Sequence, residues 1–142
     1  MVLRRRAARG AGAVLTPLAS LQWLLDFHRT WAYVAITANA IAGIICLIAW
    51  KRRSWRAHKW IWVVTIAAEA AMMVQVLVGV TLVASHDYVA PRFHMFYGFL
   101  TFLTVGIAAS YWRQMRGRRE LFYGLVGLFI MGLGIRAILQ AS

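Results

Sequence analysis

Two histidines stand at matching positions of this chain and could together hold a metal-centred cofactor. His28 and His94 each lie at the start of a long apolar segment, and each is followed four residues later by a small residue, Ala32 or Gly98. Positions four apart share one face of a helix, so each imidazole would have space beside it. Two imidazoles at one membrane depth form the axial ligand pair of a bis-histidine heme. The pattern therefore predicts a heme site, provided that the chain brings the two segments together.

The composition places these histidines in a lipid bilayer. Hydrophobic residues make up 62% of the 142 residues and charged residues only 14%, an imbalance that soluble domains do not show. The net charge of +12 comes from arginines in short runs between apolar segments, with no nucleic-acid-reading module, so no nucleic-acid partner is expected. Cys46 is the single cysteine, and the lack of a Cys-x-x-Cys-His motif excludes a covalently attached c-type heme.

Four apolar segments predict an all-α, integral membrane four-helix bundle. Each is close to the roughly 20 residues that cross a hydrocarbon core. The expected spans are residues 21–50, 60–84, 91–112 and 121–139, in one bundle domain over 21–142 that follows a basic arm over 1–20. The first and third spans run in the same direction, so both histidines should lie at the same end of the bundle.

The loop charges predict the orientation in the membrane. Loop 51–59 carries five cations and loop 113–119 carries four, whereas the 85–92 connection is nearly neutral. The positive-inside rule therefore predicts a multi-pass plasma-membrane protein with both basic loops cytoplasmic and the histidines near the outer face. The arginine-rich N-terminus conflicts with this scheme, because an even number of spans puts both termini outside. An exported arm, a short extra span over 11–27, and a natural start further downstream are all open.

The outer end of the bundle also offers groups that a heme needs beyond its axial ligands. The two propionates require cations, and three arginines are available, namely Arg29, Arg92 and Arg136. Arg136 could instead extend to the membrane interface. Gly79 and Gly98 would let the macrocycle approach the main chain. His86, in the outer loop, is the alternative ligand if His94 does not bind.

A second polar group lies deeper in the predicted membrane. Glu69 is the one carboxylate there, and Asn39 of the first span should lie at a similar depth. An intramembrane carboxyl can relay protons or contact a quinone, and it can equally form a structural hydrogen bond. Gln75 and Thr101 could form another polar layer nearer to the histidines. Both interpretations stay open.

Three segments of the chain resemble one half of the heme A synthase fold. These are residues 28–33 (HRTWAY), residues 75–83 (QVLVGVTLV), and His94 after a short outer loop. In that family each half is a four-helix bundle with paired histidines near the outer membrane face. A His-Arg step opens one helix, a Gln-x-x-x-Gly helix follows, and the second histidine opens the next. The resemblance covers residues 25–112 and implies that His28 and His94 are axial heme ligands.

The chain also departs from that family. The family has eight spans in two bundles, and here there is one bundle, whose fourth span would replace the helix that precedes the family's first histidine. The family's catalytic acidic residue stands three positions before the His-Arg step, where this chain has Leu25, while Asp26 stands two positions before it. The resemblance therefore implies a single-bundle b-type heme protein, without oxidation of a heme methyl group.

Together these observations predict a membrane protein that binds heme b and transfers electrons or handles heme near the outer face. Its partners would be the lipid bilayer and a quinone or respiratory-complex subunits, as a homo- or hetero-oligomer. Another interpretation is a cofactor-free scaffold or accessory subunit of a larger membrane complex. A small-solute transporter is less well supported, because no span is broken at the bilayer centre.

Overall fold

The chain folds into four helices, as the sequence predicts. A computed structural model describes residues 2–56, 58–85 and 88–141. Its helices are α1 (Val2–Lys51), α2 (Trp60–Ala84), α3 (Arg92–Ser110) and α4 (Arg119–Leu139), and a short 3-10 turn, η1 (Arg53–Trp55), follows α1. No β-strand occurs in the described residues, so the prediction of an all-α four-helix bundle is confirmed.

All four helices contain a stretch that is long and apolar enough to cross a membrane. These stretches are Ala19–Lys51, Trp60–Ala84, Arg92–Ser110 and Arg119–Leu139. The chain is thus a multi-pass membrane protein. The third stretch ends two residues before the predicted boundary, and the fourth begins two residues earlier than predicted. Both differences lie at helix ends, which hydropathy alone locates poorly.

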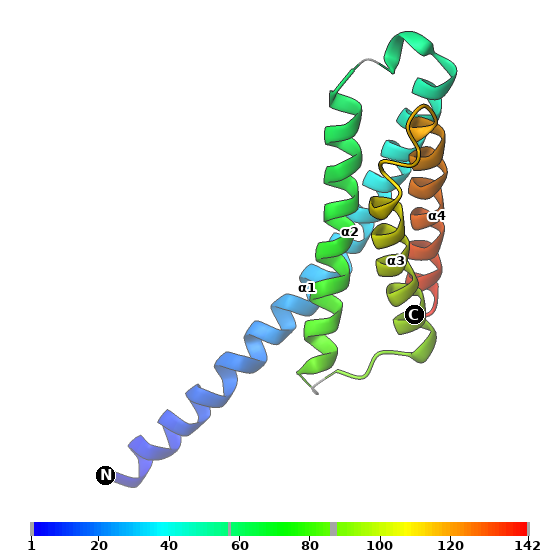
Figure 1. Cartoon of the computed structure of the whole chain (residues 1–142). Coiled ribbons are helices and arrows are strands. Elements are labelled where there is room, and N and C mark those ends of the chain that lie inside the picture. The colour runs from blue at the N-terminus through cyan, green and yellow to red at the C-terminus, as the bar shows by residue number, and fades with distance from the viewer. Residues whose placement is uncertain (1, 57, 86–87, 142) are drawn as a thin grey trace.

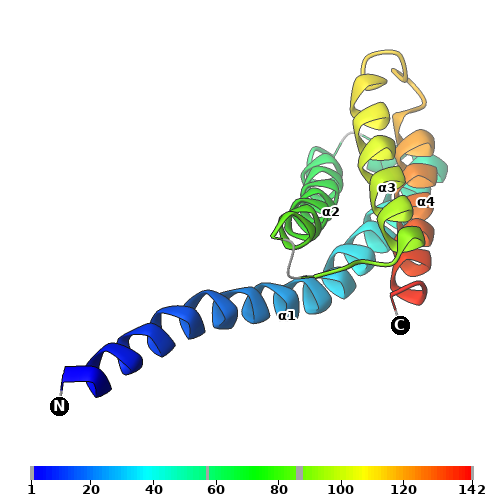
Figure 2. The ribbon, with the colours of Figure 1, turned by 90° about the horizontal axis from the view of Figure 1, so that it is seen from below.

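The first helix is much longer than one span requires. It runs for 50 residues without interruption, and its N-terminal part projects away from the bundle (Figures 1 and 2). Residues 2–20, predicted as a separate arm, therefore continue the helix of the first span. No loop separates residues 11–27 from the rest of α1. Residues 11–27 and the first span therefore do not form a helical hairpin.

The helices alternate in direction, and α1 and α3 lie diagonally across the bundle. α1 packs against α2 and α4, and α3 packs chiefly against α4, whereas α2 and α3 touch over a smaller area and α1 and α3 have no backbone contact. Both basic loops lie at one end of the bundle, and the connection from α2 to α3 lies at the other, with the end of α4 (Figure 1). We call these the basic-loop end and the histidine end.

Glycines bring the main chains of α1 and α4 into direct contact. A Cβ atom added to Gly127 would lie 2.9 Å from the Asn39 carbonyl oxygen and 3.0 Å from the Gly43 Cα. A Cβ atom on Gly43 would lie 3.0 Å from the Gly124 carbonyl oxygen. Small residues at such crossings let membrane helices pack closely. Close packing matters here because lipid tails are as apolar as the side chains, so the hydrophobic effect does not drive the helices together. Gly124 and Gly127 of α4 thus allow this close packing.

Aromatic side chains close the basic-loop end. The rings of Trp62 and Trp112 meet edge to face with 4.9 Å between their centroids, and both contact the ring of Tyr123. The Tyr123 hydroxyl donates a hydrogen bond of 2.8 Å to the Ala108 carbonyl. These contacts join α2, α3 and α4 at the level where amphipathic rings are favoured in a membrane.

The glycine contact predicts a position-specific effect of added volume. Gly127→Ala places a methyl group against main-chain atoms that cannot move aside, so we expect a loss of about 1–3 kcal/mol in unfolding free energy. Gly132→Ala is the matched control in the same helix, because a Cβ there meets nothing within 4 Å. Equilibrium unfolding in mixed micelles measures both. Equal effects of the two substitutions would contradict the α1–α4 contact.

Candidate functional site

The structure brings His28 and His94 together at the histidine end of the bundle. Their ring centroids are 6.1 Å apart, and the ring planes are inclined by 72°. His28 belongs to α1 and His94 to α3, the two helices that lie diagonally. The imidazoles therefore meet across the interior of the bundle.

The helical repeat directs both side chains inward. Along α3, the positions of Thr101, Val105 and Ala108 share a face with His94, and these three residues are buried. Along α1, Ala35 and Asn39 share the face of His28 and are buried as well. On each helix, the histidine is the residue nearest the histidine end among the side chains that face the interior of the bundle.

A hydrogen bond to α4 fixes the tautomer of His94. Its Nδ1 lies 2.9 Å from the Ala137 carbonyl oxygen. A carbonyl oxygen only accepts, so Nδ1 carries the hydrogen and donates it. In the neutral ring, Nε2 then keeps its lone pair. This is the usual state of a metal-binding histidine, whose other ring nitrogen donates to a carbonyl or carboxylate.

Gln75 of α2 holds the ring of His28. The amide nitrogen of Gln75 lies 2.9 Å from the His28 carbonyl oxygen and 3.3 Å from its Nε2, so it donates one hydrogen to each. In the neutral ring Nδ1 then carries the hydrogen. Both this Nδ1 and the Gln75 Oε1 are buried and have no hydrogen-bond partner within the described part of the chain. Such groups are rare and costly, and they often mark a place where a partner binds.

The two glycines predicted to give a heme room have different surroundings. A Cβ on Gly79 would lie 2.9 Å from Cε1 of His28, so the missing side chain of Gly79 accommodates the imidazole itself. A Cβ on Gly98 would meet nothing within 4 Å. Gly98 lies between His94 and Thr101 on the inward face of α3. Of the two glycines, only Gly98 has open space at its Cβ position.

The spacing of the two imidazoles fits one metal ion between them. Two metal–nitrogen bonds of about 2 Å, plus roughly 1 Å from each nitrogen to its ring centre, separate the centroids by about 6 Å. The described residues contain no group of three or more His, Cys, Asp or Glu that could hold a metal ion. Two imidazoles alone suit a metal whose other ligands come from a macrocycle. To bind a metal through Nε2, His28 would have to exchange the 3.3 Å hydrogen bond from Gln75 for the metal–nitrogen bond. The hydrogen bond from Gln75 to the His28 carbonyl oxygen could remain.

The three candidate propionate partners are exposed. Arg29 follows His28, Arg136 precedes Ala137, and Arg92 opens α3 two residues before His94. Within the described residues none of them pairs with a carboxylate, so their charges are available near the histidines. Their role with propionates stays a prediction. His86, the alternative ligand, lies outside the described residues.

The deeper polar residues make separate contacts. Both amide hydrogens of the buried Asn39 go to main-chain oxygens, at 2.9 Å to Ala35 and 2.8 Å to Ala68. Asn39 thereby joins α1 to α2, which is a structural role. Glu69 is half-buried, and no hydrogen bond in the described chain joins it to Asn39. Gln75 belongs to the histidine site, and Thr101 donates to the Tyr97 carbonyl of its own helix.

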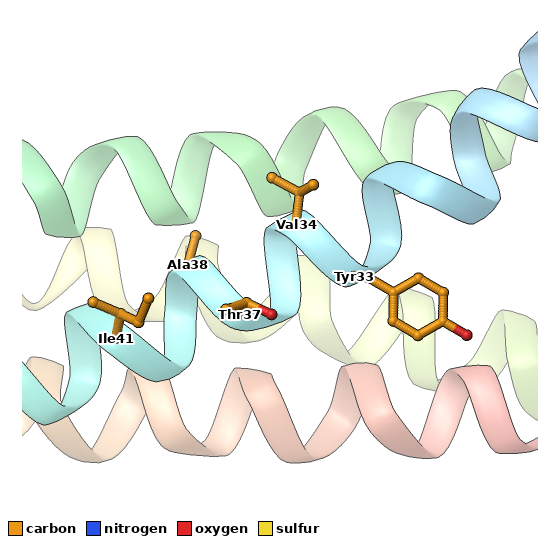
Figure 3. A pocket seen from close by; sticks show the side chains of 5 residues that line it. All are labelled: Tyr33, Val34, Thr37, Ala38 and Ile41. Carbon is orange, nitrogen blue, oxygen red and sulfur yellow. The ribbon is translucent and has the colours of Figure 1, made fainter.

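A shallow hollow on the outer face of α1 is a separate feature. Its lining consists of Tyr33, Val34, Thr37, Ala38 and Ile41 (Figure 3). All five belong to α1 and lie on the side away from the face of His28. The hollow contains no histidine, cysteine or carboxylate, so it offers no strong metal ligand.

The comparisons with known proteins add no relative. No family model, no curated protein and no solved structure matches the chain.

The hydrogen bond to Ala137 predicts a single tautomer for His94. At a pH where the ring is neutral, heme-free protein in micelles should show His94 protonated at Nδ1, because only that nitrogen faces the carbonyl. Nitrogen-15 chemical shifts report the tautomer, with His94→Gln to assign the signal. The exposed His58 provides the reference for an unconstrained ring. A His94 ring protonated at Nε2 would contradict the described geometry.

Proposed function

We propose that this chain is a membrane protein that binds one b-type heme near the outer face of the membrane. The observation that carries the proposal is the pair of facing imidazoles, 6.1 Å apart between centroids and supplied by diagonal helices. His28 and His94 would be the axial ligands.

The neighbouring residues have separate tasks in this proposal. The Ala137 carbonyl keeps Nε2 of His94 ready to bind, and Gln75 positions the ring of His28. Gly98 leaves space for the macrocycle beside His94. Arg29, Arg92 and Arg136 would neutralise the propionates. When bound, the heme supplies one-electron chemistry by cycling between ferric and ferrous iron.

A single heme near one face does not carry electrons across the whole bilayer. We therefore propose electron exchange with a quinone or a respiratory-complex subunit, or heme handling at this face. The heme-binding proposal also agrees with the motifs around His28, Gln75 and His94, which resemble those of half of heme A synthase in the sequence alone. Glu69 has no partner in the described residues that would explain its place in the membrane, and a proton relay or quinone contact is proposed for it.

The proposed location is the plasma membrane. The two basic loops, 51–59 and 113–119, lie at one end of the bundle, and by the positive-inside rule this end faces the cytoplasm (Figure 1). The histidine end then lies near the outer face.

The proposal predicts an optical signature that depends on two histidines. A dithionite-reduced minus oxidised spectrum of detergent-purified protein, expressed with ample heme, should show a sharp b-type α-band. His28→Ala and His94→Ala should each abolish it, because each removes one axial ligand. His58→Ala is the matched control and should keep the band, since His58 is exposed in a basic loop.

A second variant separates loss of the ligand from loss of space. Gly98→Leu keeps both histidines and fills the open space on the inward face of α3, so it should lower heme content while the protein stays folded. Heme-replete expression that yields a featureless spectrum would contradict the proposal. The chain would then be a cofactor-free scaffold or accessory subunit, to be characterised through the proteins that copurify with it.

A further inference from the structure

Two arginines at the basic-loop end are held in the same way on two different helix ends. The Arg56 guanidinium lies over the Trp50 ring, 4.3 Å from its centroid, and its Nη2 donates to the Trp50 carbonyl at 2.6 Å. The Arg119 guanidinium lies 4.1 Å from the centroid of Trp112, and its Nε donates to the Trp112 carbonyl at 2.8 Å. Each tryptophan lies at or just after the end of a helix that runs toward the basic loops.

The two arginines differ from the other cations around them. The loops at this end carry nine lysines and arginines, and only Arg56 and Arg119 are half-buried. The exposed ones are Lys51, Arg52, Arg53, Lys59, Arg113, Arg116 and Arg118. Stacking on an aromatic ring and bonding to a carbonyl reduce the freedom of a side chain, so less entropy is lost when it binds a further group.

Both guanidinium groups keep donors for an anion. A guanidinium has five N–H donors, and each of these arginines uses one nitrogen for the tryptophan carbonyl. The Nε of Arg56 is buried and lacks an acceptor in the described chain. Glu120, the one acidic residue nearby in sequence, is itself buried, and no ion pair with Arg119 occurs among the described residues. Planar guanidinium groups bind phosphate oxygens in pairs.

The depth of these groups favours a lipid over a soluble anion. Tryptophans cluster in membrane proteins at the level of the headgroups, and here they form the surfaces on which the guanidinium groups lie. Phospholipid phosphates are concentrated at this level. Basic residues beside a membrane span attract anionic lipids.

We propose that Arg56 and Arg119 each bind the phosphate group of an anionic phospholipid in the leaflet next to the basic loops. The remaining seven cations attract anionic lipid but do not hold a phosphate group in one position. This binding is independent of heme binding, because Arg56 and Arg119 belong to the two basic loops, which lie at the opposite end of the bundle from the connection between α2 and α3 that precedes His94 (Figure 1).

Native mass spectrometry of the full chain tests this binding, with phosphatidylglycerol titrated into detergent and phosphatidylcholine in parallel. The double variant Arg56→Gln/Arg119→Gln should weaken phosphatidylglycerol binding about tenfold or more. Arg52→Gln/Arg116→Gln is the matched control, because it removes the same charge from the same two loops. It should weaken binding no more than about threefold, since exposed charges are screened.

Two further experiments complete the test. The double variant Arg56→Lys/Arg119→Lys keeps the charge but lacks the planar stacked group, so it should also bind phosphatidylglycerol more weakly. This variant tests the proposal if the Gln double variant does not fold. Excess inorganic phosphate should leave phosphatidylglycerol bound. Equal losses in the stacked and control pairs, full affinity in the Lys pair, equal binding of phosphatidylcholine, or displacement by inorganic phosphate would each overturn the proposal.

Discussion

The close approach of α1 and α4 is the constraint on which the rest of the bundle depends. Gly43 and Gly127 bring the two main chains into contact, and Asn39, on the same stretch of α1, joins that helix to α2 through the Ala68 carbonyl. With α1 held between α2 and α4, α3 is left to pack mainly on α4. α1 and α3 are therefore diagonal, and the imidazoles of His28 and His94 face each other across the interior.

α4 also connects this packing to the chemistry of the site. The helix that contacts α1 through its glycines supplies, near its end, the Ala137 carbonyl that fixes the His94 ring. Polar groups in a bilayer interior need partners within the protein, and Asn39, Thr65 and Tyr123 have them. The exceptions at the histidine end are Nδ1 of His28 and Oε1 of Gln75. These two buried polar atoms have no partner in the described residues, and they lie beside a pair of imidazoles, which supports a ligand at that place.

The features of the bundle that depend on segment length, hydropathy and helix direction could be predicted from the sequence. The four spans, the shared end of the two basic loops, and the shared end of His28 and His94 all follow from these properties. The contacts of Gln75 with His28 and of His94 with Ala137 do not, because they depend on how far each helix is rotated about its axis. For the same reason, the contacts of Asn39 and Glu69 could not be predicted. Their depth could be counted along the chain, but Asn39 faces the main chain of α2 at Ala68 rather than the carboxyl of its neighbour.

Electron paramagnetic resonance of the oxidised protein shows whether two imidazoles, one from α1 and one from α3, bind one heme iron. Two axial imidazoles make ferric heme low-spin, and ring planes inclined by 72° give a strongly anisotropic low-spin signal. We expect this signal in the purified protein. A high-spin ferric signal from heme with at most one imidazole ligand would contradict it.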